Sequence, residues 1–340
     1  MPKDLTQGRP FRVLLQFSLP VIAGNLFQLF YTLADTVIVG RTLGAQALAA
    51  VGSTTIVIYF VLCFVQGFTG GFGICLAQRF GARDENGQRS SAAVSWLLSA
   101  GFAVIITVLF CALAHPILRW MRTPEDIYAE AYSYMFIVLL GTGATVFYNM
   151  ISNMLRSLGD SRTPLFFLIF SALLNVVLDL VFILPLGMGV AGAALSTLLS
   201  RFCAMAFLLV RLSVKDSELR LRLRNMIPDL SVIRKILYIG LPSCFENSLF
   251  QLGRILVVII ITGFGTAQIA ANAIANNLDS FGCIPGKGLQ LAVITVVGQC
   301  VGAQMKDEAY FYARKLMKIA YALTAVANIL VMATLPLTVP

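Results

Sequence analysis

The chain has 340 residues, of which 58% are hydrophobic and only 12% are charged, and its mean hydropathy is +0.85. Soluble domains carry about 25% charged residues, so this composition excludes a water-soluble globular protein and indicates that a lipid bilayer surrounds the chain. The formal net charge of +9 is therefore first explained by orientation in a membrane, and we expect no nucleic-acid partner.

Predominantly apolar stretches follow one another along the chain, each long enough to cross a hydrocarbon core about 30 Å thick. There are nine of them, at residues 13–39, 48–76, 92–118, 131–155, 164–186, 190–213, 236–262, 273–302 and 315–339. The first is too long for a signal-peptide core and lacks a small-residue cleavage site after it. We therefore predict nine membrane-spanning helices, the first of which stays in the mature protein.

Basic residues are distributed unequally between the two sides of the predicted bundle. Nineteen of the 25 Lys and Arg residues lie in connectors on the side of the N-terminus, and only Arg41, Arg119 and Arg122 lie on the other side. Connectors rich in Lys and Arg stay in the cytoplasm. The sequence therefore predicts a multi-pass protein of the inner (plasma) membrane with a cytoplasmic N-terminus.

The longest connector, residues 214–235, alternates charged residues with leucines. We interpret it as a cytoplasmic amphipathic linker between two bundles, although the pattern would also suit a helix that lies on a lipid surface. The predicted organisation is an N-terminal six-helix lobe at 1–213, this linker, and a partial C-terminal lobe of three helices at 236–340.

An internal repeat divides the chain in the same way. Four short segments recur in the same order at offsets of 221 to 223 residues: Leu19-Pro20 with Leu241-Pro242, Leu26–Leu29 with Leu249–Leu252, Ala45-Gln46 with Ala267-Gln268, and Gln78–Ala82 with Gln299–Ala303. A repeat of six spans returns the chain to the same side, so the two copies have parallel topology, as in many transporters. The second copy holds only three spans, and we expect three more spans, roughly 100 residues, in the working protein.

Ionisable side chains inside membrane spans are costly, and each is a candidate functional residue. Seven lie within the predicted spans: Asp35, Asp179, Arg201, Glu246, Arg254, Asp279 and Lys287. Asp35 falls on one polar stripe of its helix with Asn25, Gln28 and Thr32, and Asn175 lies one helical turn from Asp179. Asp35 and Asp179 are at comparable predicted depth, so their carboxyl groups could share a proton or hold a sodium ion.

Structural interpretations of the same charges are also open. Asp35 could order the helix end near Arg41, and Asp179 could pair with Arg201. In the second half, pairs of similar predicted depth, Glu246 with Lys287 and Arg254 with Asp279, could close as ion pairs between consecutive spans. The segment 284–288, which contains Pro285, is expected to interrupt its helix and line a transport path.

Four segments together resemble the multidrug and toxic compound extrusion (MATE) family. They are LPVIAGNLFQLFYTLADTVIVGRTLGAQALAAVG at 19–52, MLRSLGDSRTP at 154–164, PLGMGVAGAALST at 185–197 and ITVVGQCVGAQ at 294–304. The resemblance covers the whole chain. It implies an all-α polytopic fold of twelve helices in two six-helix bundles, of which the second is incomplete here. Relative to that pattern, the chain is expected to be truncated after the ninth helix.

The resemblance also implies a site and an activity. The family's cation-coupling acid in the first helix matches Asp35, and its Asn-x-x-x-Asp motif in the fifth matches Asn175 and Asp179. Glu246, Gln28 and Asn25 are candidates for a substrate site or a second ion site. The expected activity is alternating-access export of organic cations in exchange for protons or sodium ions.

Two other functions are open alternatives: a flippase of lipid-linked saccharide precursors with related architecture, and a fragment that does not transport. No span contains the His/Asp, Glu/His or Ser/Lys cluster that a membrane enzyme needs, so we expect no enzyme. We also expect no cofactor beyond the coupling ion, no metal site, and a monomer whose partners are small organic cations and membrane lipid.

Overall fold

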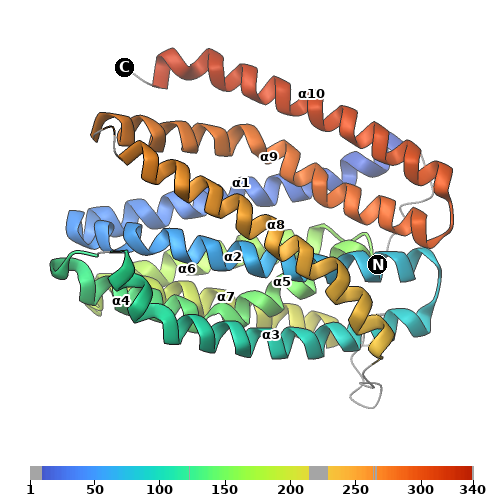
Figure 1. The fold of residues 1–340 in the computed structure, drawn as a ribbon, viewed down its shortest axis with the longest axis horizontal. Coiled ribbons are helices and arrows are strands. Elements are labelled where there is room, and N and C mark those ends of the chain that lie inside the picture. Colours follow the sequence, from blue (N-terminus) through green and yellow to red (C-terminus); the bar gives the residue numbers. More distant parts are fainter. Residues whose placement is uncertain (1–9, 122, 214–228, 263, 265, 339–340) are drawn as a thin grey trace.

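The computed structural model describes residues 10–121, 123–213, 229–262, 264 and 266–338. In this part of the chain it contains ten α-helices and no strand, which confirms the predicted all-α fold (Figure 1). The helices are α1 (Pro10–Thr42), α2 (Gly44–Gly81), α3 (Glu85–Trp120), α4 (Glu125–Leu140), α5 (Thr142–Ser157), α6 (Arg162–Ile183), α7 (Gly189–Ser213), α8 (Leu230–Thr262), α9 (Thr266–Gly302) and α10 (Lys306–Thr338).

Most of these helices are long and apolar enough to cross a membrane. Within the described residues seven helices meet this criterion, and the bent pair α4 and α5 adds an eighth span if it is counted as one. α8, which was also predicted to span, is not among them; it carries Glu246 and Arg254 in its interior.

The fourth predicted span is a pair of helices. Residues 131–155 were expected to form one helix, but α4 ends at Leu140, α5 begins at Thr142, and the two are bent by 41°. Gly141 lies at the junction, next to Val138 and to Leu198 of α7. Glycine is a poor helix former and allows a bend at low cost, so the prediction of one continuous helix was wrong here.

The predicted interruption at Pro285 does not occur. α9 continues through Pro285 from Thr266 to Gly302 as one helix. A proline removes one backbone hydrogen bond, and neighbouring helices in a membrane bundle can compensate for this loss without a break in the helix. Three residues after Pro285, Gly288 of α9 lies directly against Ile22 of α1.

The start of α8 lies inside the segment that was predicted as the linker. Residues 214–228 lie outside the described part, but α8 already begins at Leu230, inside the segment 214–235 that was assigned to the linker. The Asp229 carboxylate accepts hydrogen bonds from the Ser231 hydroxyl at 2.7 Å and the Ser231 N–H at 2.9 Å, which satisfies a free donor at the helix start. The bond from the Ser231 hydroxyl is the main reason that the pKa of Asp229 lies below its ordinary value.

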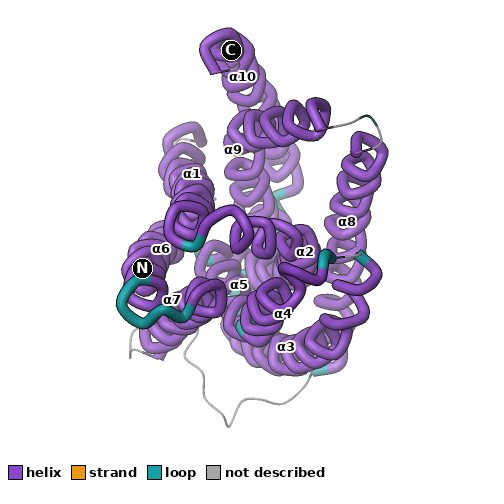
Figure 2. Tube along the Cα trace, turned by 90° about the vertical axis from the view of Figure 1, so that its left-hand side faces the viewer, coloured by secondary structure: helices purple, strands orange, loops and turns teal. Residues whose placement is uncertain are grey.

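We call the side on which α1 begins and α2 ends the inner face, because the charge distribution predicts that it is cytoplasmic, and the opposite side the outer face. Helices α1–α7 form one lobe, and α8–α10 lie beside it (Figure 2). Toward the outer face α8 and α9 diverge from α1 and α2, whereas at the inner face the end of α9 meets the end of α2 (Figure 1).

The structure confirms the internal repeat at the ends of α2 and α9. In α2 the N–H groups of Ala82, Arg83 and Asp84 donate to the carbonyls of Gln78, Phe80 and Arg79. In α9 Ala303, Gln304 and Met305 donate in the same pattern to the carbonyls of Gln299, Val301 and Cys300. Arg83 and Gln304 are also the two non-glycine residues with positive φ in the described chain, at 54° and 60°.

These two equivalent helix ends pack against each other through glycine. A Cβ atom on Gly81 would collide with the backbone carbonyl of Gln299, and one on Gly302 would collide with the carbonyl of Gln78. The contacts are reciprocal, so α2 and α9 touch backbone to backbone around a local two-fold axis. We call this contact the inner crossing. The Gln299 side chain adds a bond, because its Nε2 donates to the Ser157 carbonyl at 2.8 Å.

A second pair of contacts obeys the same symmetry. Gly67 of α2 packs against α8, where an added Cβ would lie 2.7 Å from the Cys244 Cα atom. Its counterpart in the repeat, Gly288 of α9, packs against Ile22, which is the counterpart of Cys244. The two halves therefore meet through four glycines from corresponding positions of the two repeats.

Candidate cation-binding site

The three residues predicted to bind the coupling ion meet between α1 and α6. Asp35 of α1 and Asp179 of α6 place their carboxyl groups in direct contact. Asn175 lies one turn before Asp179, and both side chains are 0% exposed. Earlier on α1, Gly24 packs against Leu165 and Leu168 of α6.

Two hydroxyl groups of α7 complete the surroundings of Asp179. The Ser196 hydroxyl donates to the Asp179 Oδ1 atom, and the Asn175 amide lies 3.3 Å from the hydroxyls of both Ser196 and Thr197. With the amide nitrogen turned toward the carboxylate, Asn175 donates to the Asp179 Oδ2 atom at 2.9 Å and its oxygen accepts from the Thr197 Oγ1 atom at 3.3 Å.

The turn between α6 and α7 positions these hydroxyls. Gly187 and Gly189 both have a φ of 58°, a left-handed conformation that favours glycine. The turn lets α7 fold back along α6, where Gly192 packs against Phe182. Ser196 and Thr197 were not predicted as site residues. The only sequence signal was their place in AALST, a run of small residues that suits close helix packing.

Two tyrosines and an arginine surround the pair of acids. The Tyr31 side chain of α1 makes a hydrogen bond with Thr197 and interacts electrostatically with Asp35, Asp179 and Arg201. Tyr134 of α4, 8% exposed, interacts with the same three charges. Tyr134 was not predicted, since one aromatic in an apolar span gives no functional signal.

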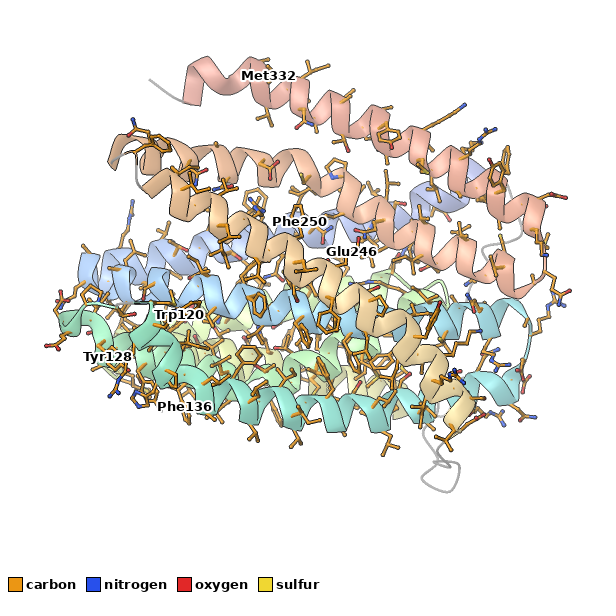
Figure 3. All side chains as sticks on the ribbon, viewed as in Figure 1. Trp120, Tyr128, Phe136, Glu246, Phe250 and Met332 are labelled. Atoms are coloured by element: carbon orange, nitrogen blue, oxygen red, sulfur yellow. The ribbon has the colours of Figure 1, made fainter. Side chains whose placement is uncertain are left out.

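The other candidate residues do not join this cluster. On α1, Asn25 is half-buried and Gln28 is exposed, and neither side chain has a hydrogen bond to the two acids. Glu246 is exposed on α8 (Figure 3). Within the described residues no ion pair joins Glu246 to Lys287, so that expected pair was wrong; both side chains are exposed on their helices instead.

The second expected ion pair is present. Arg254 lies 3.7 Å from the Asp279 carboxylate and donates to the Asn276 Oδ1 atom at 2.8 Å. The structural alternatives for the first lobe are not found, because no ion pair joins Asp35 to Arg41 or Asp179 to Arg201 in the described chain. Arg201 instead donates to the Thr145 Oγ1 atom at 3.2 Å.

The arrangement suits a proton or a small hard cation. Its potential ligands are all oxygen atoms, from two carboxylates, an amide and two hydroxyls, and oxygen ligands are preferred by hard cations. The Asp35 Oδ1 atom is buried and has no hydrogen-bond partner among the described residues. A buried carboxylate oxygen without a partner is costly unless a proton or cation neutralises it. The described site residues therefore form a place where one positive charge would be stabilised.

A protein-family model matches this chain. The model described as MatE matches residues 20–181 and 242–338, which is most of the chain. The probable multidrug resistance protein YpnP of Bacillus subtilis (strain 168) is 31% identical over 299 residues, which cover 88% of this chain and 67% of the relative. The probable multidrug resistance protein NorM of Thermotoga maritima is 30% identical, with coverage of 86% and 64%. The chain thus spans about two thirds of the length of these relatives.

Solved structures have the same fold. An outward-facing conformation of a multidrug resistance MATE family transporter of the MOP superfamily has a TM-score of 0.89 at 29% identity, and the match covers 100% of this chain and 75% of that one. A MOP superfamily transporter from Pyrococcus furiosus, described as having a binding pocket of reverse polarity that suggests a different function, also scores 0.89 at 30% identity over 99% and 74% of the two chains.

Proposed function

Because the chain belongs to the MATE family, we propose that it is a secondary antiporter that exports organic cations in exchange for protons or sodium ions. The observation that carries the proposal is the contact of Asp35 with Asp179 in a buried, oxygen-rich site. The names of the relatives, which describe multidrug resistance proteins, support small organic substrates for this chain.

The coupling follows from differential affinity. A bound ion can shift a two-state transporter only by as much as its affinities for the two states differ. The cluster is built from α1, α4, α6 and α7, so a conformational change that moves α1 away from α6 would separate Asp35 from Asp179 and change ion affinity. We propose that ion binding here drives the conformational change that releases the organic cation on the outer side.

We further propose that the protein lies in the plasma membrane as a monomer with its N-terminus in the cytoplasm. The excess of Lys and Arg on the side of the N-terminus supports this orientation. The same excess makes the inner crossing a contact on the cytoplasmic side.

Asp35→Asn tests the proposed function. The change keeps the size of the side chain but removes the charge that attracts an ion, so gradient-driven export of a fluorescent organic cation should fall to the level of protein-free vesicles. Proton and sodium gradients would be imposed in turn on vesicles that carry the longest natural reading frame containing this sequence. The gradient that drives export in the unmutated protein names the ion.

Glu85→Gln is the matched control, because Glu85 is an exposed acid at the start of α3, remote in sequence and contact from the site. It should export at the unmutated rate. Ion-driven export that persists in Asp35→Asn would contradict the assignment. Correctly inserted unmutated protein that exports no organic cation under either gradient would point instead to lipid-linked cargo.

A further inference from the structure

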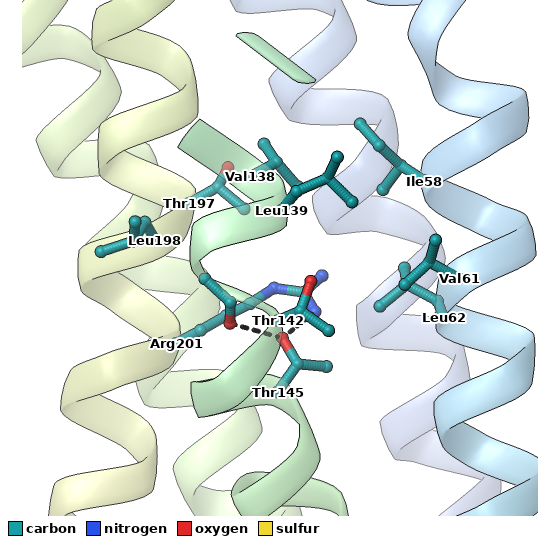
Figure 4. Close-up of a pocket in the computed structure, with 11 residues that line it drawn as sticks. Ile58, Val61, Leu62, Val138, Leu139, Thr142, Thr145, Thr197, Leu198 and Arg201 are labelled. Atoms are coloured by element: carbon teal, nitrogen blue, oxygen red, sulfur yellow. Dashed lines mark hydrogen bonds between the residues drawn. The ribbon is translucent and has the colours of Figure 1, made fainter. Parts of the chain in front are cut away.

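Arg201 lies in a small pocket next to the pair of acids. The pocket is formed by residues of α2, α4, α5 and α7, and it lies where α4 and α5 bend around Gly141 (Figure 4). Arg201 is the one charged residue that lines it. Thr197, which contacts Asn175 in the ion site, lines the same pocket four residues earlier on α7. One face of α7 therefore serves both the pocket and the ion site.

In the described chain the guanidinium of Arg201 is held by a hydrogen bond and not by an ion pair. Its Nη1 atom donates to the Thr145 Oγ1 atom at 3.2 Å, and Thr145 in turn donates to the Gly141 carbonyl at 3.3 Å (Figure 4). No carboxylate of the described chain lies within ion-pair distance of it. A guanidinium has five N–H donors and stays charged at all relevant pH values. Arg201 is thus a half-buried cation in a membrane span without an ion-pair partner.

The charges that face this cation belong to the ion site. Arg201 interacts electrostatically with Asp35 and Tyr31 of α1, with Tyr134 of α4 and with Tyr148 of α5. Asp179 of α6 belongs to the same cluster through its contact with Asp35. The residues of α2 that line the pocket, Ile58, Val61 and Leu62, are uncharged. Two acids and one fixed cation leave a net charge of −1 when both acids are ionised.

We infer that Arg201 is the tethered counter-cation of the Asp35–Asp179 site, and that it competes with the coupling ion for the Asp35 carboxylate. When the ion leaves, the guanidinium moves from Thr145 to Asp35 and neutralises it. When the ion returns, the guanidinium goes back to Thr145. The site then holds one monovalent ion at a time. In the ion-free form the guanidinium pairs with Asp35, and the remaining charge, on Asp179, is stabilised by its hydrogen bonds from Ser196 and Asn175. Arg201 is a positioning residue here, and the inference rests on the proposed function.

Arg201→Gln tests the inference through the ion dependence of the protein. Removal of the competing charge should strengthen ion binding, so the half-saturating ion concentration should fall about tenfold; if the ion is a proton, the midpoint of the pH profile should rise by about one unit. Arg201→Lys keeps the charge and should restore the unmutated ion dependence. Equilibrium binding of the same ion to detergent-solubilised protein gives a readout that does not depend on transport.

Thr145→Val provides a test of opposite sign. It removes the hydroxyl that holds the guanidinium away from Asp35, so ion binding should weaken and the half-saturating concentration should rise. A half-saturating concentration that is unchanged in both Arg201→Gln and Thr145→Val, with thermal unfolding as in the unmutated protein, would overturn the inference. A purely structural role predicts reduced thermal stability in Arg201→Gln and in Arg201→Lys without a change in ion dependence, which would overturn it as well.

A failure of the proposed function gives a different result from a failure of the role inferred for Arg201. If Asp35→Asn keeps ion-driven export, the ion site itself is wrong. If Asp35→Asn abolishes export while Arg201→Gln leaves ion binding unchanged, the ion site stands and only the role of Arg201 is refuted.

Discussion

Alanine at Gly81 or Gly302 is expected to force the inner crossing apart. Each glycine faces a backbone carbonyl of the opposite helix, so an added Cβ cannot be accommodated by rotation of a side chain and the helices themselves must move. Overpacking of this kind costs about 1–3 kcal/mol. A conformation in which the inner ends of α2 and α9 separate does not bear this cost, so each substitution should shift the population toward it roughly tenfold to a hundredfold.

Labelling of Cys300 measures the shift. Cys300 of α9 is 0% exposed and packs at the inner end of the interface with Phe17 and Val21 of α1. In a protein whose six other cysteines are replaced by alanine, a membrane-impermeant maleimide should react much faster with Cys300 in Gly81→Ala and Gly302→Ala. Export should fall by at least tenfold, since one half of the transport cycle is disfavoured.

Gly70→Ala is the matched control for the inner crossing. Gly70 lies in the same helix as Gly81, but an added Cβ there meets nothing within 4 Å. In Gly70→Ala, Cys300 should react with the maleimide at the unmutated rate, and export should also be unchanged. If Gly81→Ala behaves in the same way as Gly70→Ala, the inner crossing does not limit the closed conformation.

Asn175→Leu is expected to cause the second large effect. The amide of Asn175 has the carboxylate of Asp179 and the hydroxyls of Ser196 and Thr197 around it, and the side chain is fully buried. Leucine has a similar shape but no hydrogen-bonding group. A hydrogen bond to a charged group contributes about 1.5–3 kcal/mol, so ion affinity should fall about tenfold to a hundredfold.

Titration of export with the driving ion measures this loss. Asn175→Leu should need a higher ion concentration for half-maximal export, and its rate at saturating ion should recover if the fold is intact. Ser171→Ala is the control, because Ser171 bonds to the Ser200 carbonyl in the same α6–α7 interface but does not contact the acids. An ion titration of Asn175→Leu that matches the control would remove Asn175 from the site.

Much of the architecture could be predicted from the sequence, because the sequence patterns that indicate it are long or repeated. Nine apolar stretches predicted nearly all of the helices, and four matched segments predicted a two-fold relation that the structure repeats down to the backbone bonds after Gln78 and Gln299. Breaks within a span were harder to predict. Gly141 ends a helix whereas Pro285 does not, and which of these occurs depends on neighbours that the local sequence does not show.

The candidate site was predictable only in part, for a similar reason. A carboxylate in an apolar span stands out, so Asp35 and Asp179 could be found, and one helical turn of spacing added Asn175. Ser196, Thr197 and Tyr134 are common in membrane helices, and only the fold shows that they face the acids. Arg201 was identified within a span, but the alternative that paired it with Asp179 is not found, and its observed hydrogen-bond partner is Thr145.

The reciprocity of the inner crossing has a consequence for its kinetics. Each helix end contributes both a glycine and the carbonyl that faces the other glycine, so neither contact can be released while the other stays in register. We therefore expect the inner ends of α2 and α9 to separate in one concerted step with one barrier, and not residue by residue. Partly opened states should be rare, and a continuous path across the membrane would have little time to form.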